Sequence, residues 1–241
     1  MKIPQLIEAV DRLHEPSWKK RHENKCKAAK SHRVDIVLAG DSVTENLETL
    51  RDPVRPERNY ARVWERYYAM RNPLNLGFSG DGTQHLLWRI TNGEIDGINP
   101  KLAIVLIGTN DINYLGKTAE YTVAAINTNL VELRRRLPRT AILLLGILPC
   151  DRGDKELEEI RKVNSALAGQ YGRGQVSPVV YKDVSNLFFK NGTLDTSLFH
   201  DPMEDPPGPA LHPTPDGMTL LAEELEPEVS VLLGERPAAL G

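Results

Sequence analysis

Short apolar runs of strand length alternate along the chain with longer segments of helical periodicity. The strongest runs cover 34–39, 102–107 and 141–148, and weaker ones cover 73–78 and 179–184. The runs 102–107 and 141–148 are apolar at successive positions, which is typical of strands buried on both faces of a parallel sheet. The pattern therefore predicts five strands in a largely buried sheet.

Helical spacing of apolar residues predicts a helix in each interval between these runs and one more after the last run. The predicted helices are 59–70, 82–92, 118–136, 155–171 and 215–233. Because strands and helices alternate throughout, the chain is predicted to form a three-layer α/β/α sandwich with right-handed crossovers.

No composition shift or internal repeat divides the chain. Residues 1–30 are predicted to be a helical extension of the same domain, which itself covers 31–233. The stretch 200–215 holds six prolines and no periodicity, so it is predicted to be a loop. Residues 234–241 are expected to form a flexible tail.

Composition and charge narrow the class of protein. The chain has 241 residues, of which 40% are hydrophobic and 26% are charged, as in soluble globular proteins. A net charge of −3 gives no electrostatic reason to expect binding of nucleic acid or of an anionic membrane. Two basic clusters, 19–21 and 134–136, lie in helical patterns and are expected on solvated faces.

The two cysteines, Cys26 and Cys150, are too far apart and too few to indicate a disulfide framework or a metal site. No run reaches the roughly 20 apolar residues of a membrane span. The N-terminus lacks the charged-then-apolar build of a signal peptide, which favours the cytoplasm for the chain as given. A mature exported form would lack such a segment too, so the compartment stays open.

Polar or glycine-rich residues follow each strong strand. The first strand ends at Gly40-Asp41-Ser42, the second leads into Gly80, and the third leads into Asn110. His212 follows the fifth strand and precedes the last helix. Loops after the carboxyl ends of parallel strands converge on one crevice, so these residues are expected to lie together.

This set of residue types suits acyl transfer, which needs a nucleophile, a base and donors to the developing oxyanion. Ser42 can act as the nucleophile and His212 as the base. The backbone N–H groups of Ser42 and Gly80 and the side-chain amide of Asn110 can donate to the oxyanion. Each motif alone is more often a turn, a cap or a loop residue, and only their order on successive strand ends favours catalysis.

Three of the other histidines are interpreted as structural or surface residues. His85 lies on the apolar side of a predicted helix beside Leu86 and is expected to pack there. His32 and His200 are expected at the surface.

These four blocks resemble the SGNH (GDSL) hydrolase superfamily, which is named for Ser, Gly, Asn and His in this chain order. The resemblance covers most of residues 34–233. Within the superfamily, the chain is most similar to the platelet-activating-factor acetylhydrolase-like group. The similarity to that group runs through 74–83, 87–90, 92–94, Pro100-Lys101 with 108–110, and 162–164.

The resemblance implies a flavodoxin-like sheet with strand order 2-1-3-4-5 and esterase chemistry on short acyl groups, with no metal or organic cofactor. It implies that Ser42 is the nucleophile, that Ser42, Gly80 and Asn110 form the oxyanion hole, and that His212 is the base. Asp41 is expected to organise the turn rather than to act as the acid of a triad.

One position departs from the superfamily pattern, because Pro209 stands where the acid is usually found, three residues before the histidine. In one interpretation Asp205 folds back onto His212 across a proline-rich insertion, with Asp201 or Glu204 as lesser candidates. In a second, a backbone carbonyl fixes the tautomer of His212 in a Ser-His dyad. In a third, the protein is a weakly active or inactive relative that binds a ligand.

The substrate is predicted only by class, as a small ester with a short acyl group such as acetate. A carbohydrate O-acetylesterase of the same fold is the leading alternative, and a flavin- or phosphate-binding module in the same crevice is a rival from another class. Residues 1–30 and the last helix could also support a homodimer. Aromatic residues that could line the site, although core packing is the more frequent role, are Trp64, Tyr67, Tyr68, Phe78 and Tyr114.

Overall fold

The five apolar runs form one parallel sheet with the order β2-β1-β3-β4-β5 in the computed structural model, which describes residues 7–51, 55–172 and 179–235. This confirms the predicted three-layer α/β/α fold and its flavodoxin-like strand order. The strands are β1 (Ile36–Gly40), β2 (Pro73–Gly77), β3 (Leu102–Leu106), β4 (Ala141–Leu145) and β5 (Val179–Lys182).

The predicted strand 141–148 is too long, because β4 ends at Leu145. Beyond this point the Asn164 side chain binds the backbone of Ile147. It accepts the Ile147 N–H at 2.8 Å and donates to the Ile147 carbonyl at 2.9 Å. Gly146 still donates its N–H to the Lys182 carbonyl of β5 at 2.9 Å, but residues 146–148 lie beyond the end of β4. They stay buried, which explains why their apolar character extended the prediction.

The longer helices lie close to their predicted positions. They are α1 (Pro16–Ser31), α3 (Ala61–Tyr67), α4 (Thr83–Thr91), α6 (Ala119–Arg136), α7 (Asp154–Tyr171) and α8 (Pro215–Leu233). The sequence pattern missed two five-residue helices, α2 (Ser42–Asn46) and α5 (Thr109–Asn113), and the hairpin of β6 (Phe189–Lys190) and β7 (Thr193–Leu194). Short 3-10 turns cover Pro56–Arg58, Ala69–Arg71, Ser185–Phe188, Thr196–Leu198 and Asp201–Met203.

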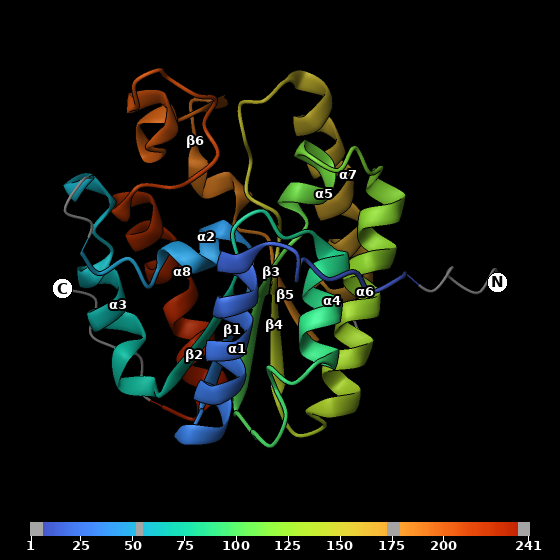
Figure 1. Ribbon diagram of the computed structural model, residues 1–241. Helices are drawn as coiled ribbons and strands as arrows, with labels where there is room; N and C mark the ends of the chain where they lie inside the picture. Colours follow the sequence, from blue (N-terminus) through green and yellow to red (C-terminus); the bar gives the residue numbers. More distant parts are fainter. Residues whose placement is uncertain (1–6, 52–54, 173–178, 236–241) are drawn as a thin grey trace.

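Two apolar cores lie on opposite faces of the sheet. One joins the sheet to α1, α4, α6 and α7, and the other joins it to α3 and α8. Figure 1 shows this layering, with α3 and α8 on one side of the strands and α4, α6 and α7 on the other. The carboxyl ends of β1, β2 and β3 therefore open at one end of the sandwich, between the two helical layers.

The N-terminal extension contains one described helix, α1, which contacts the core through Trp18 and Ala29. Gly234 ends α8 in a left-handed conformation, and the remainder of the predicted tail, 236–241, lies outside the described residues. Within 7–51, 55–172 and 179–235, no helix has the length and apolar character needed to cross a bilayer.

Candidate active site

Ser42 is the first residue of α2, and only Asp41 separates it from the end of β1 at Gly40. Gly40 is required there, since a Cβ would lie 2.2 Å from the Thr44 hydroxyl oxygen and 2.4 Å from the Leu106 carbonyl. Asp41 caps α2 by accepting the Val43 N–H at 3.0 Å, and burial raises its pKa to about 7. Asp41 thus organises the turn, as expected, and presents Ser42 at the sheet edge.

His212 links Ser42 to a carboxylate. The Ser42 Oγ lies 3.0 Å from His212 Nε2, and His212 Nδ1 lies 2.6 Å from Asp201 Oδ1. The second oxygen of Asp201 accepts the backbone N–H groups of Leu211 at 2.9 Å and of His212 at 2.6 Å. The Asp201 side chain therefore fixes both the ring and the backbone of the histidine.

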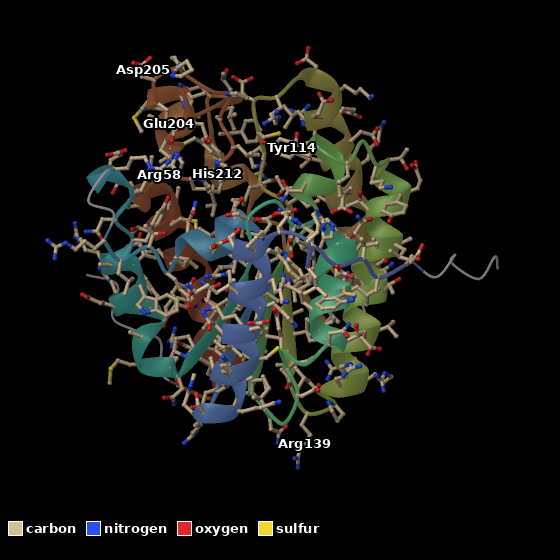
Figure 2. All side chains as sticks on the ribbon, viewed as in Figure 1. Arg58, Tyr114, Arg139, Glu204, Asp205 and His212 are labelled. Carbon is tan, nitrogen blue, oxygen red and sulfur yellow. The ribbon has the colours of Figure 1, made fainter. Side chains whose placement is uncertain are left out.

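The prediction that Asp205 contacts His212 is wrong, and so is the alternative in which a backbone carbonyl fixes this histidine. Asp205 is exposed at the outer part of the 200–215 loop, above His212 in Figure 2. A bridge between Phe199 and Pro213 and a 3.0 Å hydrogen bond from His200 N to His212 O align the two ends of the loop. This pairing places Asp201 beside His212, while the proline-rich insertion loops away from the site.

Asp201 is held as a carboxylate. Its burial opposes ionisation, but the hydrogen bonds from the His212 side chain and from the His212 and Leu211 amides lower its pKa to about 2. An ionised Asp201 accepts the Nδ1–H of His212, so Nε2 is left as the acceptor that faces Ser42.

His200, expected at the surface, is buried with 1% of its area exposed. Its ring stacks on that of His212 with centroids 5.4 Å apart and planes within 4° of parallel. Burial, with the positive charge of Arg58 as a further cause, lowers the pKa of His200 to about 4, so it is neutral near pH 7. No periodic pattern indicates this contact, because His200 lies in an irregular loop. His85 does pack as expected, and its Nδ1 accepts the Gly82 N–H at 2.9 Å.

Gly80 and Asn110 line the same cleft as His212. Gly80 has a φ of +78°, in the left-handed region that favours glycine. Asn110 lies in α5 and donates one N–H to the Asp81 carbonyl at 2.8 Å, which holds its amide in place next to the Gly80 loop. The structure thus brings both sequence-predicted donors to the loop edge that carries Ser42.

A cleft of about 480 Å³ contains Ser42, Gly80, Asn110 and His212. Arg58 forms an ion pair with Glu204, and Arg152 stacks over the Tyr114 ring at 4.3 Å. Figure 2 shows Arg58, His212 and Tyr114 at the same end of the molecule, opposite Arg139. The other residues that line this cleft are Asn46, Arg58, Ser79, Tyr114 and Leu211.

Among the candidate aromatic residues, only Tyr114 lines this cleft, with 56% of its area exposed. Tyr67, Tyr68 and Phe78 are buried, and Trp64 packs against the core that includes α3 and α8. Core packing is therefore the role of four of the five.

A buried ionic cluster lies beneath the cleft, and the sequence analysis assigned it no role. Arg89 is fully buried and donates to Asp81 at 2.8 Å and to Glu94 at 2.6 Å. It also donates to the carbonyls of Gly40 at 3.2 Å and Leu76 at 3.1 Å. One sequence feature could have indicated this cluster. Arg89 lies among the apolar residues of α4, and a buried arginine needs carboxylate or carbonyl partners.

Replacing Arg89 by methionine should lower the free energy of unfolding by about 3–5 kcal/mol, because two buried carboxylates would lose the cation that they share and Asp81 would be left with Arg12. Denaturant titration followed by circular dichroism would measure this loss. Arg135→Met is the matched control, since Arg135 pairs with Glu132 at the surface and should change stability little. A loss at Arg89 no larger than at Arg135 would show that the cluster does not stabilise the fold.

Comparison with known proteins gives a consistent result. A family model described as GDSL-like Lipase/Acylhydrolase family matches residues 38–220. The human platelet-activating factor acetylhydrolase IB subunit alpha1 is 32% identical over 157 residues, covering 63% of this chain and 62% of the relative. The chain thus spans about three fifths of that relative's length.

Two further matches cover more of the chain. The rat platelet-activating factor acetylhydrolase IB subunit alpha2 is 27% identical over 239 residues, covering 98% of this chain and 92% of the relative. A solved GDSL-like lipase from Bacteroides thetaiotaomicron superposes with a TM-score of 0.65 at 16% identity, covering 90% of this chain and 99% of that chain. At that identity the structural match bears on the fold alone.

Proposed function

Because this chain belongs to the GDSL-like lipase/acylhydrolase family, we propose that it is an ester hydrolase that cleaves short-chain esters, acetyl esters above all, through an acyl-enzyme on Ser42. The observation that carries this proposal is the hydrogen-bonded series from Ser42 Oγ through His212 to Asp201 at one wall of the cleft. No organic cofactor or metal is needed for this chemistry.

In the first half-reaction, Ser42 Oγ bonds to the ester carbonyl carbon while its proton passes to His212 Nε2. The backbone N–H groups of Ser42 and Gly80 and the amide of Asn110 donate to the oxyanion that forms. The tetrahedral intermediate then expels the alcohol, which takes the proton from His212. Water repeats the sequence in the second half-reaction and releases the acid, which regenerates the free serine.

The lining of the cleft supports a short acyl group. Asn46, Arg58, Ser79 and Asn110 are polar, and an alkyl chain placed against them would gain little from burial. We expect kcat/KM to fall by about tenfold or more from p-nitrophenyl acetate to p-nitrophenyl octanoate, since the added methylenes would desolvate polar groups. Initial rates across acetate, butyrate and octanoate measure this dependence.

A serine-directed fluorophosphonate provides the matching control, because labelling at Ser42 reports a reactive serine whether or not a given ester is a substrate. Turnover of none of the esters, together with no labelling, would overturn the esterase proposal and favour a ligand-binding relative. Faster hydrolysis of octanoate than of acetate would overturn the short-acyl part alone.

The polar lining also favours a hydrophilic alcohol, and an acetylated carbohydrate is the second candidate. Arg58, which forms an ion pair with Glu204, and the exposed ring of Tyr114 both line the cleft and can contact the alcohol. Acetate release from glucose pentaacetate, compared with release from a 2-acetyl phospholipid in the same assay, would separate the sugar from the lipid.

A further inference from the structure

Three side chains ahead of β1 hold the segment between β2 and α4, which carries Gly80. Arg12 donates to the Ser79 carbonyl at 2.8 Å, and Arg21 donates to the Gly77 carbonyl at 2.8 Å. Trp18 donates its ring N–H to Asp81 at 2.8 Å. Arg21, predicted to lie on a solvated face, is therefore engaged with the backbone beside the site.

Arg12 makes the contacts nearest to Gly80. Its Nη1 atom donates both to the Ser79 carbonyl and to Asp81 Oδ1, each at 2.8 Å, so it spans the residues on either side of the glycine. The same atom lies 3.1 Å from the position that a Gly80 Cβ would take. The arginine thus covers the face of this turn that carries the Ser79 carbonyl.

Peptide geometry connects this contact to the cleft. The Ser79 carbonyl and the Gly80 N–H belong to the same peptide unit, and in a planar trans peptide they point in opposite directions. Because Arg12 binds the Ser79 carbonyl, the Gly80 N–H of the same peptide points away from Arg12. Gly80 and Ser42 line the cleft, whereas Arg12 is not among its lining residues.

Asp81 connects the Asn110 amide, another predicted oxyanion donor, to Arg12. Its buried carboxylate binds Arg12, Trp18 and Arg89. Its backbone carbonyl accepts the Asn110 side-chain amide at 2.8 Å. A shift of the turn at Asp81 would therefore displace the Gly80 N–H and the Asn110 amide together.

We propose that Arg12 is a positioning residue of the oxyanion hole, which sets the direction of the Gly80 N–H through the Ser79 carbonyl and steadies Asn110 through Asp81. This inference rests on the proposed esterase function of the same site. It assigns to the N-terminal segment a part in transition-state stabilisation that the Ser42, His212 and Asp201 side chains do not supply.

The test compares Arg12→Met with the unaltered full chain on p-nitrophenyl acetate. We expect kcat to fall about ten- to a hundredfold with KM within about twofold, because a misdirected donor weakens the transition state more than the ground state. A small trifluoromethyl ketone adds to the serine as a hemiketal whose oxyanion occupies the same donors. Its inhibition constant should rise by the same factor as kcat/KM falls.

Arg12→Lys should recover part of kcat, since an ammonium can still donate to both Ser79 and Asp81. Arg33→Met is the control for loss of a cation, because Arg33 is largely exposed and pairs with Asp35 away from the cleft. If Arg12→Met fails to fold, Arg12→Lys and Glu15→Gln carry the test. Glu15 holds the Nε and Nη2 atoms of Arg12 and leaves Nη1 in place, so its loss should lower kcat less.

Unchanged kcat and an unchanged inhibition constant in Arg12→Met would overturn the inference. The inference would also be overturned if the variant had fewer active sites, counted by fluorophosphonate labelling, but each remaining site kept its normal rate and inhibition constant. Failure of the esterase proposal itself would appear separately, as an unaltered chain that neither turns over the ester nor is labelled.

Discussion

Replacing Ser42 by alanine should lower kcat for p-nitrophenyl acetate by about 10⁶-fold, the size of loss seen when the nucleophile of a serine hydrolase is removed. Only the hydroxyl can form the acyl-enzyme, and Ser42 Oγ is hydrogen-bonded to His212 Nε2. Alanine fits the first position of α2, so the fold should persist. Initial rates and the intact mass of enzyme quenched during turnover measure the loss of rate and of the acetyl adduct.

Ser197→Ala is the matched control, because this exposed serine lies in the 3-10 turn Thr196–Leu198, away from the cleft, and should leave kcat unchanged. The oxyanion donors survive in Ser42→Ala, so a residual acceleration over water is expected. Retention of more than about a hundredth of the activity, or an acetyl adduct on another residue, would contradict the assignment of Ser42.

The sequence predicted the parts of the site that regular elements position. Ser42, Gly80 and Asn110 each follow a buried strand, and the carboxyl ends of parallel strands must meet at one edge of the sheet. Hydrophobic periodicity located β1, β2 and β3, so the convergence of these residues followed from topology alone.

The partner of His212 could not be predicted in this way, because it depends on how an irregular loop folds. Asp201 lies eleven residues before His212 in sequence, and spacing gave no reason to prefer it over Asp205. The Phe199 and Pro213 bridge that aligns the loop ends is a single pairing with no periodic signature. The superfamily spacing, with the acid three residues before the histidine, fails here because the proline-rich insertion lengthens the loop. The two paired ends of the loop keep their positions.

The buried ionic cluster was missed for a different reason. Asp81, Arg89 and Glu94 lie in the stretch 81–94 around α4, whereas Arg12 is 69 residues before Asp81. A charged residue in a sequence is usually solvated. Only the packing of α1 against β2 and α4 shows that these charges neutralise one another under the cleft. Tertiary contacts between distant segments therefore carry the information that local pattern lacks.

Replacing Asp201 by asparagine should lower kcat by about 10⁴-fold, as the same exchange does in a serine protease. The backbone N–H groups of Leu211 and His212 require an acceptor, so the asparagine carbonyl should keep that position. Its NH₂ group would then face His212 Nδ1 and donate to it. The histidine would hold its proton on Nε2, pointing at Ser42, and could no longer accept the serine proton.

Asp205→Asn is the matched control, because it removes a carboxylate of the same loop that is exposed and outside the contacts of His212. We expect it to leave kcat within about twofold of the unaltered enzyme, while KM for a neutral ester stays similar in both variants. The reverse ranking, with Asp205→Asn severe and Asp201→Asn mild, would mean that the loop rearranges during catalysis and brings Asp205 to the histidine. A mild effect of both would mean that the His212 tautomer is fixed without a carboxylate. In that case the stacked ring of His200 and the paired loop ends would have to orient the base by themselves.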